Sequence, residues 1–261
     1  MKHQLYEKSQ TTEPYSQKEL GWLLDHVGDS DASIRDDLVY ASFCHALLDG
    51  LVKTVDFVWL ADQVIKRNLL FYKIEEVGQT TLTRSFSALL GALLIGVDGD
   101  ETSPYHLILP ENLRTILFQS ALEYLQQETD SAGFSAEFGW VHAFAHGADF
   151  LLYASLHDKF PYPYEVVWST IVSVFKQQAK AFTAGESDRL ATIVVQLLLI
   201  GKIQAETLLQ WLVETEFPHE ADADYLTWIN YQQFLRAIYV ELDHHHQLTD
   251  ELRTALYQVC N

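Results

Sequence analysis

The sequence is poor in cysteine and in long apolar runs. Its two cysteines, Cys44 and Cys260, are too few and too far apart for a disulfide framework or a cysteine metal cluster. The longest apolar run, residues 193–200, is interrupted by Gln196 and falls short of the roughly 18 residues that span a bilayer. The N-terminal residues do not lead into an apolar signal region. We therefore expect a cytoplasmic protein that does not enter a membrane.

Positive charge is also scarce. The chain carries 17 Lys and Arg against 36 Asp and Glu, which gives a net charge of −19. The summed field of such a chain repels nucleic-acid phosphates and anionic membrane surfaces, so nucleic-acid binding is disfavoured. We favour solubility as the role of this charge over an acidic surface that recognises a basic partner.

Sustained alternation of apolar and polar residues, the pattern of a half-buried strand, is absent from the sequence. Apolar residues instead recur at helical spacing in about eleven segments. Pairs of these segments recur every 45 residues or so, roughly the period of HEAT and armadillo arrays, but no repeated signature accompanies them. We predict an all-α fold, a HEAT/armadillo-like α-α superhelix of about eleven helices. An irregular helical bundle is the alternative.

The polar patterning also suggests where the folded part begins. Residues 1–15 are polar and aperiodic, and we interpret them as a flexible N-terminal arm. Ser16 and Glu19 have the spacing of a capping box, which predicts a helix start. With 48% hydrophobic residues, residues 16–261 are predicted to form a single helical-repeat-like domain.

The most informative stretch covers residues 133–152. Its central polar side chains are those of His142, His146 and Asp149, and Tyr153 comes directly after the stretch. On one helix these four would lie within roughly 60° of one another, and the other positions from 140 to 152 are apolar or small. We predict a buried helix that presents a single polar stripe to a cavity or a facing helix.

Two imidazoles at i and i+4, as at His142 and His146, can reach one metal ion. Position 143 is Ala, where a metalloprotease of the His-Glu-x-x-His type keeps its glutamate, so that chemistry is excluded. Three interpretations remain open. They are a hydrogen-bonded buried histidine pair, a divalent metal site completed from another helix, and a pocket for an organic or anionic ligand.

Arg84 stands on a mostly apolar helical segment. Burying a guanidinium without a partner costs several kcal/mol, and Asp149 is the predicted partner. A structural ion pair is favoured over a pair that receives a substrate carboxylate or phosphate. Arg189, at the start of a later helix, is expected to take part in capping and local pairing.

Three segments together carry a resemblance. They are residues 83–90 (Thr-Arg-Ser-Phe-Ser-Ala-Leu-Leu), 139–149 (Gly-Trp-Val-His-Ala-Phe-Ala-His-Gly-Ala-Asp) and 186–190 (Glu-Ser-Asp-Arg-Leu). The chain resembles a bacterial family known as domain of unknown function 2785, and the Gly-Trp-x-His-x-x-x-His-x-Ala-Asp element is its most specific part. The resemblance implies a helical, cytosolic, single-domain protein without an established activity. It also groups the following residues into one constellation: Arg84, Trp140, His142, His146, Asp149 and Arg189.

Two functional hypotheses follow. The first is a non-enzymatic scaffold or binding protein with a central polar pocket for a small anionic ligand or a peptide. Its ligand-binding residues are predicted to be Arg84, Trp140, His142, His146, Asp149, Tyr153 and Arg189. The alternative is a metal-dependent hydrolase in which His142 and His146 hold a divalent metal ion and Asp149 orients a ligand or acts as base.

Overall fold

The computed structural model describes residues 1–218 and 221–260, and their regular secondary structure is helical apart from one short hairpin. The predicted all-α fold is therefore confirmed, whereas its HEAT-like stacking stays a prediction. The chain divides into two compact units, Met1–Pro161 and Tyr162–Asn261. The single domain predicted for residues 16–261 stays a prediction as well.

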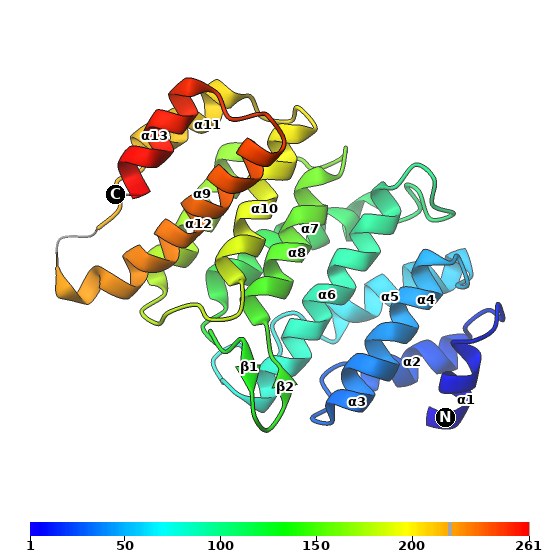
Figure 1. The fold of residues 1–261 in the computed structure, drawn as a ribbon. Helices are drawn as coiled ribbons and strands as arrows, with labels where there is room; N and C mark the ends of the chain where they lie inside the picture. Colours follow the sequence, from blue (N-terminus) through cyan, green and yellow to red (C-terminus); the bar gives the residue numbers. More distant parts are fainter. Residues whose placement is uncertain (219–220, 261) are drawn as a thin grey trace. The chain divides into compact units, whose positions relative to one another are not determined.

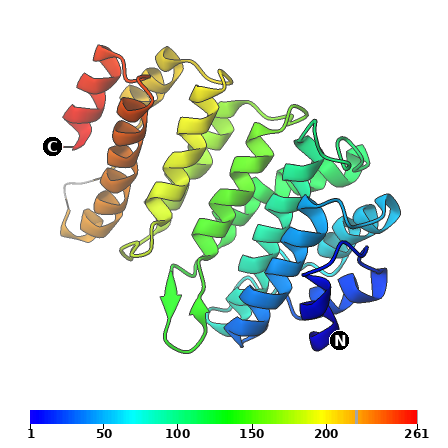
Figure 2. The ribbon, with the colours of Figure 1, turned by 45° about the vertical axis from the view of Figure 1, so that its right-hand side comes forward.

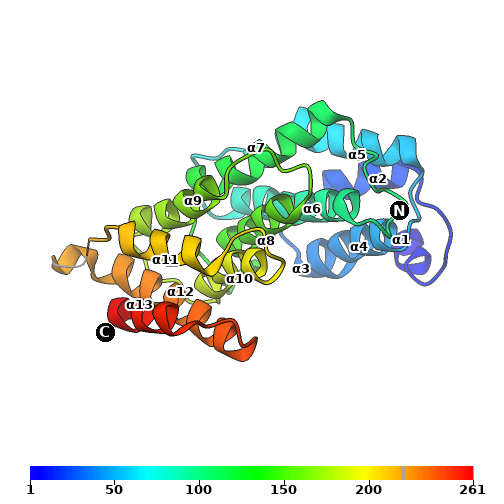
Figure 3. The ribbon, with the colours of Figure 1, turned by 90° about the horizontal axis from the view of Figure 1, so that it is seen from above.

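The first unit consists of short N-terminal helices, four longer helices and the hairpin (Figure 1). Its elements are α1 (Lys2–Lys8), α2 (Gln17–Asp25), α3 (Ala32–Ile34), the π-helix η1 (Arg35–Tyr40), α4 (Ala41–Leu48), α5 (Thr54–Lys66), α6 (Gln79–Gly99), α7 (Glu111–Gln127), β1 (Phe134–Ser135), β2 (Gly139–Trp140) and α8 (Ala143–Leu156). The hairpin projects at the start of α8 (Figure 2). Seen from above, α2, α5 and α7 form one layer, and α4, α6 and α8 form the other (Figure 3).

Helix α6 is the central element of this unit. By length and composition it could cross a membrane, but 72% of its most apolar stretch is buried inside the protein, as in the core helix of a soluble domain. Its sequence contains no long unbroken apolar run, because Ser, Thr and Gly interrupt its leucines. These small residues let α8 approach closely: a Cβ atom on Gly91 would lie 2.9 Å from the ring of Phe150.

Part of the expected flexible arm is helical, and its flexibility stays a prediction. Residues Lys2–Lys8 form helix α1, whose Leu5 is fully buried. Lys8 pairs with Glu19 at 2.8 Å, and the amide of Tyr15 donates to the carbonyl of Leu51. These contacts are tertiary, so the aperiodic sequence gives no sign of them. The capping box of Ser16 and Glu19 is confirmed.

The second unit is built around one long helix. Its elements are α9 (Tyr164–Gln177), α10 (Glu186–Leu199), α11 (Ala205–Glu214), the short 3₁₀ helix η2 (Asp222–Asp224), α12 (Tyr225–His244) and α13 (Asp250–Cys260). Helix α12 packs against α9, α10 and α13, and Phe234 on its buried face lies 5.1 Å from Phe175, measured between ring centroids. The side chain of Cys260 lies outside the described part of the chain, whereas Cys44 in the first unit is half-buried and free.

Candidate functional site

The predicted polar stripe begins in a hairpin and continues along α8. Helix α8 starts at Ala143, and His142 precedes it with a φ of 47° in the left-handed region. Trp140 lies in strand β2 and pairs with Phe134 of β1, so the prediction that the helix already includes residue 140 is wrong. Gly139, with a φ of 73°, supplies a backbone conformation that ends any helix there. Of the stripe, only His146, Asp149 and Tyr153 are in the helix.

A row of three rings leads from the surface into the protein. The rings of Trp140 and His142 stack with centroids 4.4 Å apart and planes 9° apart. The ring of His146 follows at 5.6 Å from that of His142. Trp140 is 48% exposed, whereas His146 is only 9% exposed. The ring of His142 thus supports one face of the Trp140 ring, while part of the Trp140 ring remains open to a ligand.

Ser85 on α6 determines which ring nitrogen of His146 carries the proton. The Ser85 Oγ donates to the carbonyl of Val141 and lies 2.8 Å from His146 Nδ1. A carbonyl can only accept, so the single hydroxyl proton is used there, and Nδ1–H of His146 must donate to Oγ. Neutral His146 therefore keeps Nε2 as its acceptor. Ser85 is fully buried, and its hydroxyl links α6 to Val141 and to His146 of α8.

Arg35, which the sequence analysis missed, ties the hairpin to the π-helix η1. Its buried guanidinium donates to the Asp36 carboxylate at 2.8 Å and lies 4.6 Å above the ring of Phe86. Its other acceptors are the carbonyl oxygens of Asp29, Phe138 and Trp140. π-Helical turns are rare and recur at functional sites. In the sequence Arg35 resembles any charged residue in the first turn of a helix, so no sequence pattern identified it as a site residue.

Groups at residues 142, 149 and 153 act on the pKa values of two side chains of η1, those of Asp36 and Tyr40. Burial raises the pKa of the Asp36 carboxyl, although Arg35 and, more weakly, His142 act in the opposite direction. Burial, followed by the neighbouring Cys44, Asp149 and Tyr153, raises the pKa of the Tyr40 phenol well above its ordinary value. We define the η1–α8 surface as Asp36, Tyr40, Trp140, His142, His146, Asp149 and Tyr153.

Arg84 does not pair with Asp149, and that prediction is wrong. Its guanidinium binds both carboxylate oxygens of Glu128, at 2.7 and 2.9 Å, and both side chains are fully buried. The same carboxylate accepts from the amides of Thr129 and Asp130. Glu128 directly follows α7, so the side chain of Arg84 reaches towards the end of that helix. The pair anchors the segment that leads into the hairpin, and the guanidinium is not available to a ligand.

Three consecutive residues of α6 thereby position the site. Arg84 holds the segment before the hairpin, and Ser85 holds the residues after it. The ring of Phe86 supports Arg35 and meets the ring of His146 edge-on at 5.0 Å. Within the Thr-Arg-Ser-Phe-Ser pattern at residues 83–87, Arg84, Ser85 and Phe86 thus position groups on other elements.

The metal site at His142 and His146 stays a prediction. Among residues 1–218 and 221–260, no group of three or more His, Cys, Asp and Glu side chains is arranged to hold a metal ion. The ring of His142 lies flat against Trp140, and Nδ1 of His146 is bonded to Ser85. The geometry of the described residues therefore offers His142 and His146 as a pair without a completed coordination shell.

Two further predicted residues are Tyr153 and Arg189. Tyr153 is 46% exposed, and its ring packs against Gly96, where a Cβ atom would lie 3.1 Å from it. Arg189 is in the first turn of α10 in the second unit, where its amide donates to the carbonyl of Gly185. Its membership of the constellation stays a prediction.

A comparison with known protein families identifies the family of the chain. The family described as "Protein of unknown function (DUF2785)" matches residues 70–240. This stretch holds α6, the hairpin, α8, α10 and most of α12. No curated protein and no solved structure gives a significant match. Because the match covers more than half of the sequence, the chain belongs to this family of unknown function, DUF2785.

Proposed function

We propose that this protein is a binding protein whose η1–α8 surface receives a basic segment of a partner protein. The observation that supports this most directly is the combination of carboxylates with open aromatic rings. Asp149 is partly exposed and shares the surface with Trp140 and Tyr153, each nearly half exposed. Asp36, already bound by Arg35, adds negative charge on the same surface. A Lys or Arg side chain can bind an aromatic face and a carboxylate at the same time.

The two arginines near this region argue for a basic rather than an anionic ligand. Arg84 is fully buried and bound by Glu128, and Arg35 is fully buried and bound by Asp36 and three carbonyl groups. Neither guanidinium is free to meet a carboxylate or phosphate. The net charge of −19 also repels anions and attracts cations. We therefore favour the peptide over the small anionic ligand that the sequence suggested.

The rigidity of the surface favours binding as well. Arg35 fixes the hairpin against η1, and Ser85 fixes Val141 and His146 against α6. A surface whose side chains are already ordered loses less conformational entropy on binding. Partly exposed Trp and Tyr side chains on such a surface are the residue types that dominate binding energy in protein interfaces.

The test is a screen of the full chain against an array of random peptides. We expect the bound peptides to be enriched in Lys and Arg. For the best peptide, W140A and D149N should each weaken binding by about tenfold, which corresponds to about 1.4 kcal/mol. D158N is the matched control, because it removes the same charge at an exposed position just after α8 and should change the affinity less than twofold.

Three outcomes would contradict the proposal. These are an array without saturable binding, an enrichment of acidic peptides, and an equal loss of affinity in D149N and D158N. The last result would mean that the peptide responds to the overall charge of the chain and not to this surface. Circular dichroism of each variant checks that the fold is kept.

A further inference from the structure

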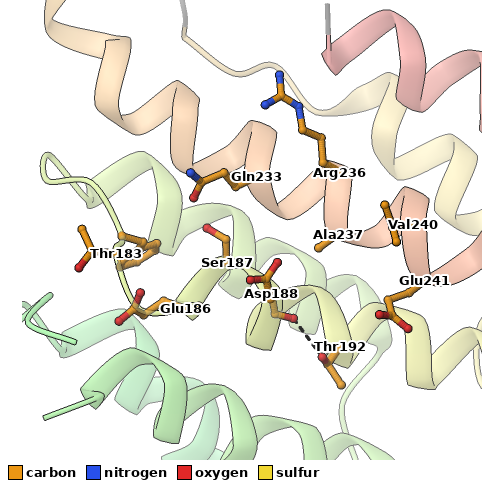
Figure 4. A pocket seen from close by; sticks show the side chains of 12 residues that line it. Thr183, Glu186, Ser187, Asp188, Thr192, Gln233, Arg236, Ala237, Val240 and Glu241 are labelled. Atoms are coloured by element: carbon orange, nitrogen blue, oxygen red, sulfur yellow. Dashed lines mark hydrogen bonds between the residues drawn. The ribbon is translucent and has the colours of Figure 1, made fainter. Parts of the chain in front are cut away.

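A separate pocket lies in the second unit, between the first half of α10 and the second half of α12 (Figure 4). It has a volume of about 580 Å³, and the segment that precedes α10 closes one side of it. Pockets that hold small molecules have volumes of roughly 300–1,000 Å³. This pocket is large enough for a ligand of that class. Its lining includes Glu186, Ser187 and Asp188 of the 186–190 segment, and the η1–α8 surface does not include it.

The walls of the pocket are fixed by Asn230, which is fully buried on α12. Its Oδ1 accepts from the amide of Phe182 at 2.8 Å, and its Nδ2 donates to the carbonyl of Lys180 at 2.8 Å. The hydroxyl of Ser187 on α10 donates to the Asn230 carbonyl. One residue therefore binds the loop and both helices together. Because these walls are already ordered, a ligand that enters the pocket does not have to order them.

The charged side chains that line the pocket indicate the charge of its ligand. Three carboxylates line the pocket, those of Glu186, Asp188 and Glu241, against one guanidinium, that of Arg236. Figure 4 shows the Arg236 guanidinium directed away from Asp188. The interior is therefore governed by negative charge, which favours a cation.

Helix stability alone does not explain these carboxylates. Glu186 and Asp188 stand in the first turn of α10, where negative charge stabilises the helix dipole. Glu241 lies in the last turn of α12, where the dipole disfavours a carboxylate. Its local partner His245 is 3.9 Å away, beyond hydrogen-bond distance. The carboxylate of Glu241 at the pocket therefore destabilises the end of α12, and a bound cation would offset this unfavourable interaction.

We infer that this pocket binds a small organic amine. Its ammonium groups would pair with Asp188 and Glu241. Thr183 and Gln233, both exposed at the rim, offer a hydroxyl and an amide to polar substituents of the ligand. The buried ring of Phe182 and the methyl group of Ala237 accommodate its carbon chain. This ligand class is independent of the peptide proposed for the first unit.

The test uses spermidine as the probe in isothermal titration calorimetry with the full chain. We expect saturable binding to one site, which the D188N/E241Q double variant weakens at least tenfold. D250N/E251Q is the matched control, since it removes one Asp and one Glu charge from exposed positions of α13 in the same unit, and it should weaken binding less than twofold. A third variant, A237F, fills the pocket without a change of charge and should also abolish binding.

The inference is overturned if wild-type protein shows no saturable spermidine binding. It is also overturned if both double variants lose the same affinity, because the amine would then respond to net charge alone. Unchanged binding in A237F would place the amine outside the pocket. Since A237F alters a half-buried position that borders open space, circular dichroism should show a folded protein, and the loss of binding is then attributable to the filled pocket.

Discussion

Two arginines in the first unit are fully buried, and each is bound by a carboxylate and by backbone carbonyl groups. Arg84 binds Glu128 and also donates to the carbonyls of Tyr72 and Lys73. Arg35 binds Asp36 and three carbonyls. Taking such a charge out of water is costly, and only a complete set of acceptors offsets the cost. Both residues therefore organise the site through the segments that they hold.

Replacement of Arg84 by Met is predicted to be severely destabilising. R84M leaves the buried Glu128 carboxylate without its counter-charge, which should lower the free energy of unfolding by about 3–5 kcal/mol. R67M is the matched control, because Arg67 pairs with Asp25 at 2.7 Å on the surface of the same unit and should contribute about 1 kcal/mol or less. Urea unfolding monitored by circular dichroism measures both. Equal losses in the two variants would show that the buried pair contributes no more than an exposed one.

The sequence predicted that Arg84 needs a partner but gave the wrong one. Helical periodicity tells which face a residue occupies, and it does not tell which other helix lies against that face. Asp149 stood out because it belongs to a polar stripe, whereas Glu128 sits just after a helix among other polar residues. Arg35 was missed for a similar reason, since its acceptors at residues 138 and 140 lie more than 100 positions away.

At the scale of elements, close helix contact depends on glycine. In α8, a Cβ atom on Gly147 would lie 2.7 Å from the ring of Tyr124, a fully buried side chain of α7. In α2, a Cβ atom on Gly21 would lie 3.8 Å from the nearest atom of Trp59, which is an ordinary contact. The same substitution should therefore have opposite effects in the two helices.

We predict that G147A destabilises the protein and that G21A stabilises it. Overpacking against the immobile ring of Tyr124 should cost about 1–3 kcal/mol, more than the gain in helix propensity. At Gly21 only the propensity gain operates, about 1 kcal/mol or less. Thermal unfolding of both variants measures the difference. A stabilising G147A would contradict the close packing of α7 and α8.

The start of α8 was also predictable only in part. Its apolar face and the spacing of His146, Asp149 and Tyr153 indicated a helix, and a helix is present. The hairpin before it was missed because its strands contain only two residues each, too few to show alternation. Tertiary contacts hold it instead: the amides of Val141 and His142 donate to the Gly133 carbonyl, and Arg35 binds its second strand.

At the scale of the whole molecule, the helical class followed from periodicity alone, because each long helix buries one face and repeats its apolar residues accordingly. The division of the chain into two units after Pro161 could not be predicted from this periodicity. The Phe-Pro-Tyr-Pro sequence at residues 160–163 marks the end of one helix and the start of the next, but such a break occurs between any two helices. The density of contacts on either side distinguishes a unit boundary, and that is a property of the folded chain.

Net charge is a second property of the whole molecule, and it predicts how stability depends on salt. A charge of −19 destabilises the compact chain through self-repulsion. Sodium chloride screens exposed charges over a distance of about 10 Å at 0.1 M, and buried pairs such as Arg84–Glu128 are screened much less. Added salt at neutral pH should therefore raise the melting temperature, by about 2–4 °C for each kcal/mol of repulsion removed.

The pH dependence of this salt effect is the decisive control. Near pH 4.8, the isoelectric point of the sequence, the net charge is close to zero and the repulsion disappears. Salt should then leave the melting temperature unchanged or lower it, because the remaining exposed charges attract one another on average. Differential scanning fluorimetry at several salt concentrations and both pH values measures the effect. A melting temperature that falls with salt at neutral pH would show that local ion pairs such as Arg67–Asp25 and Arg253–Asp243 outweigh the overall repulsion.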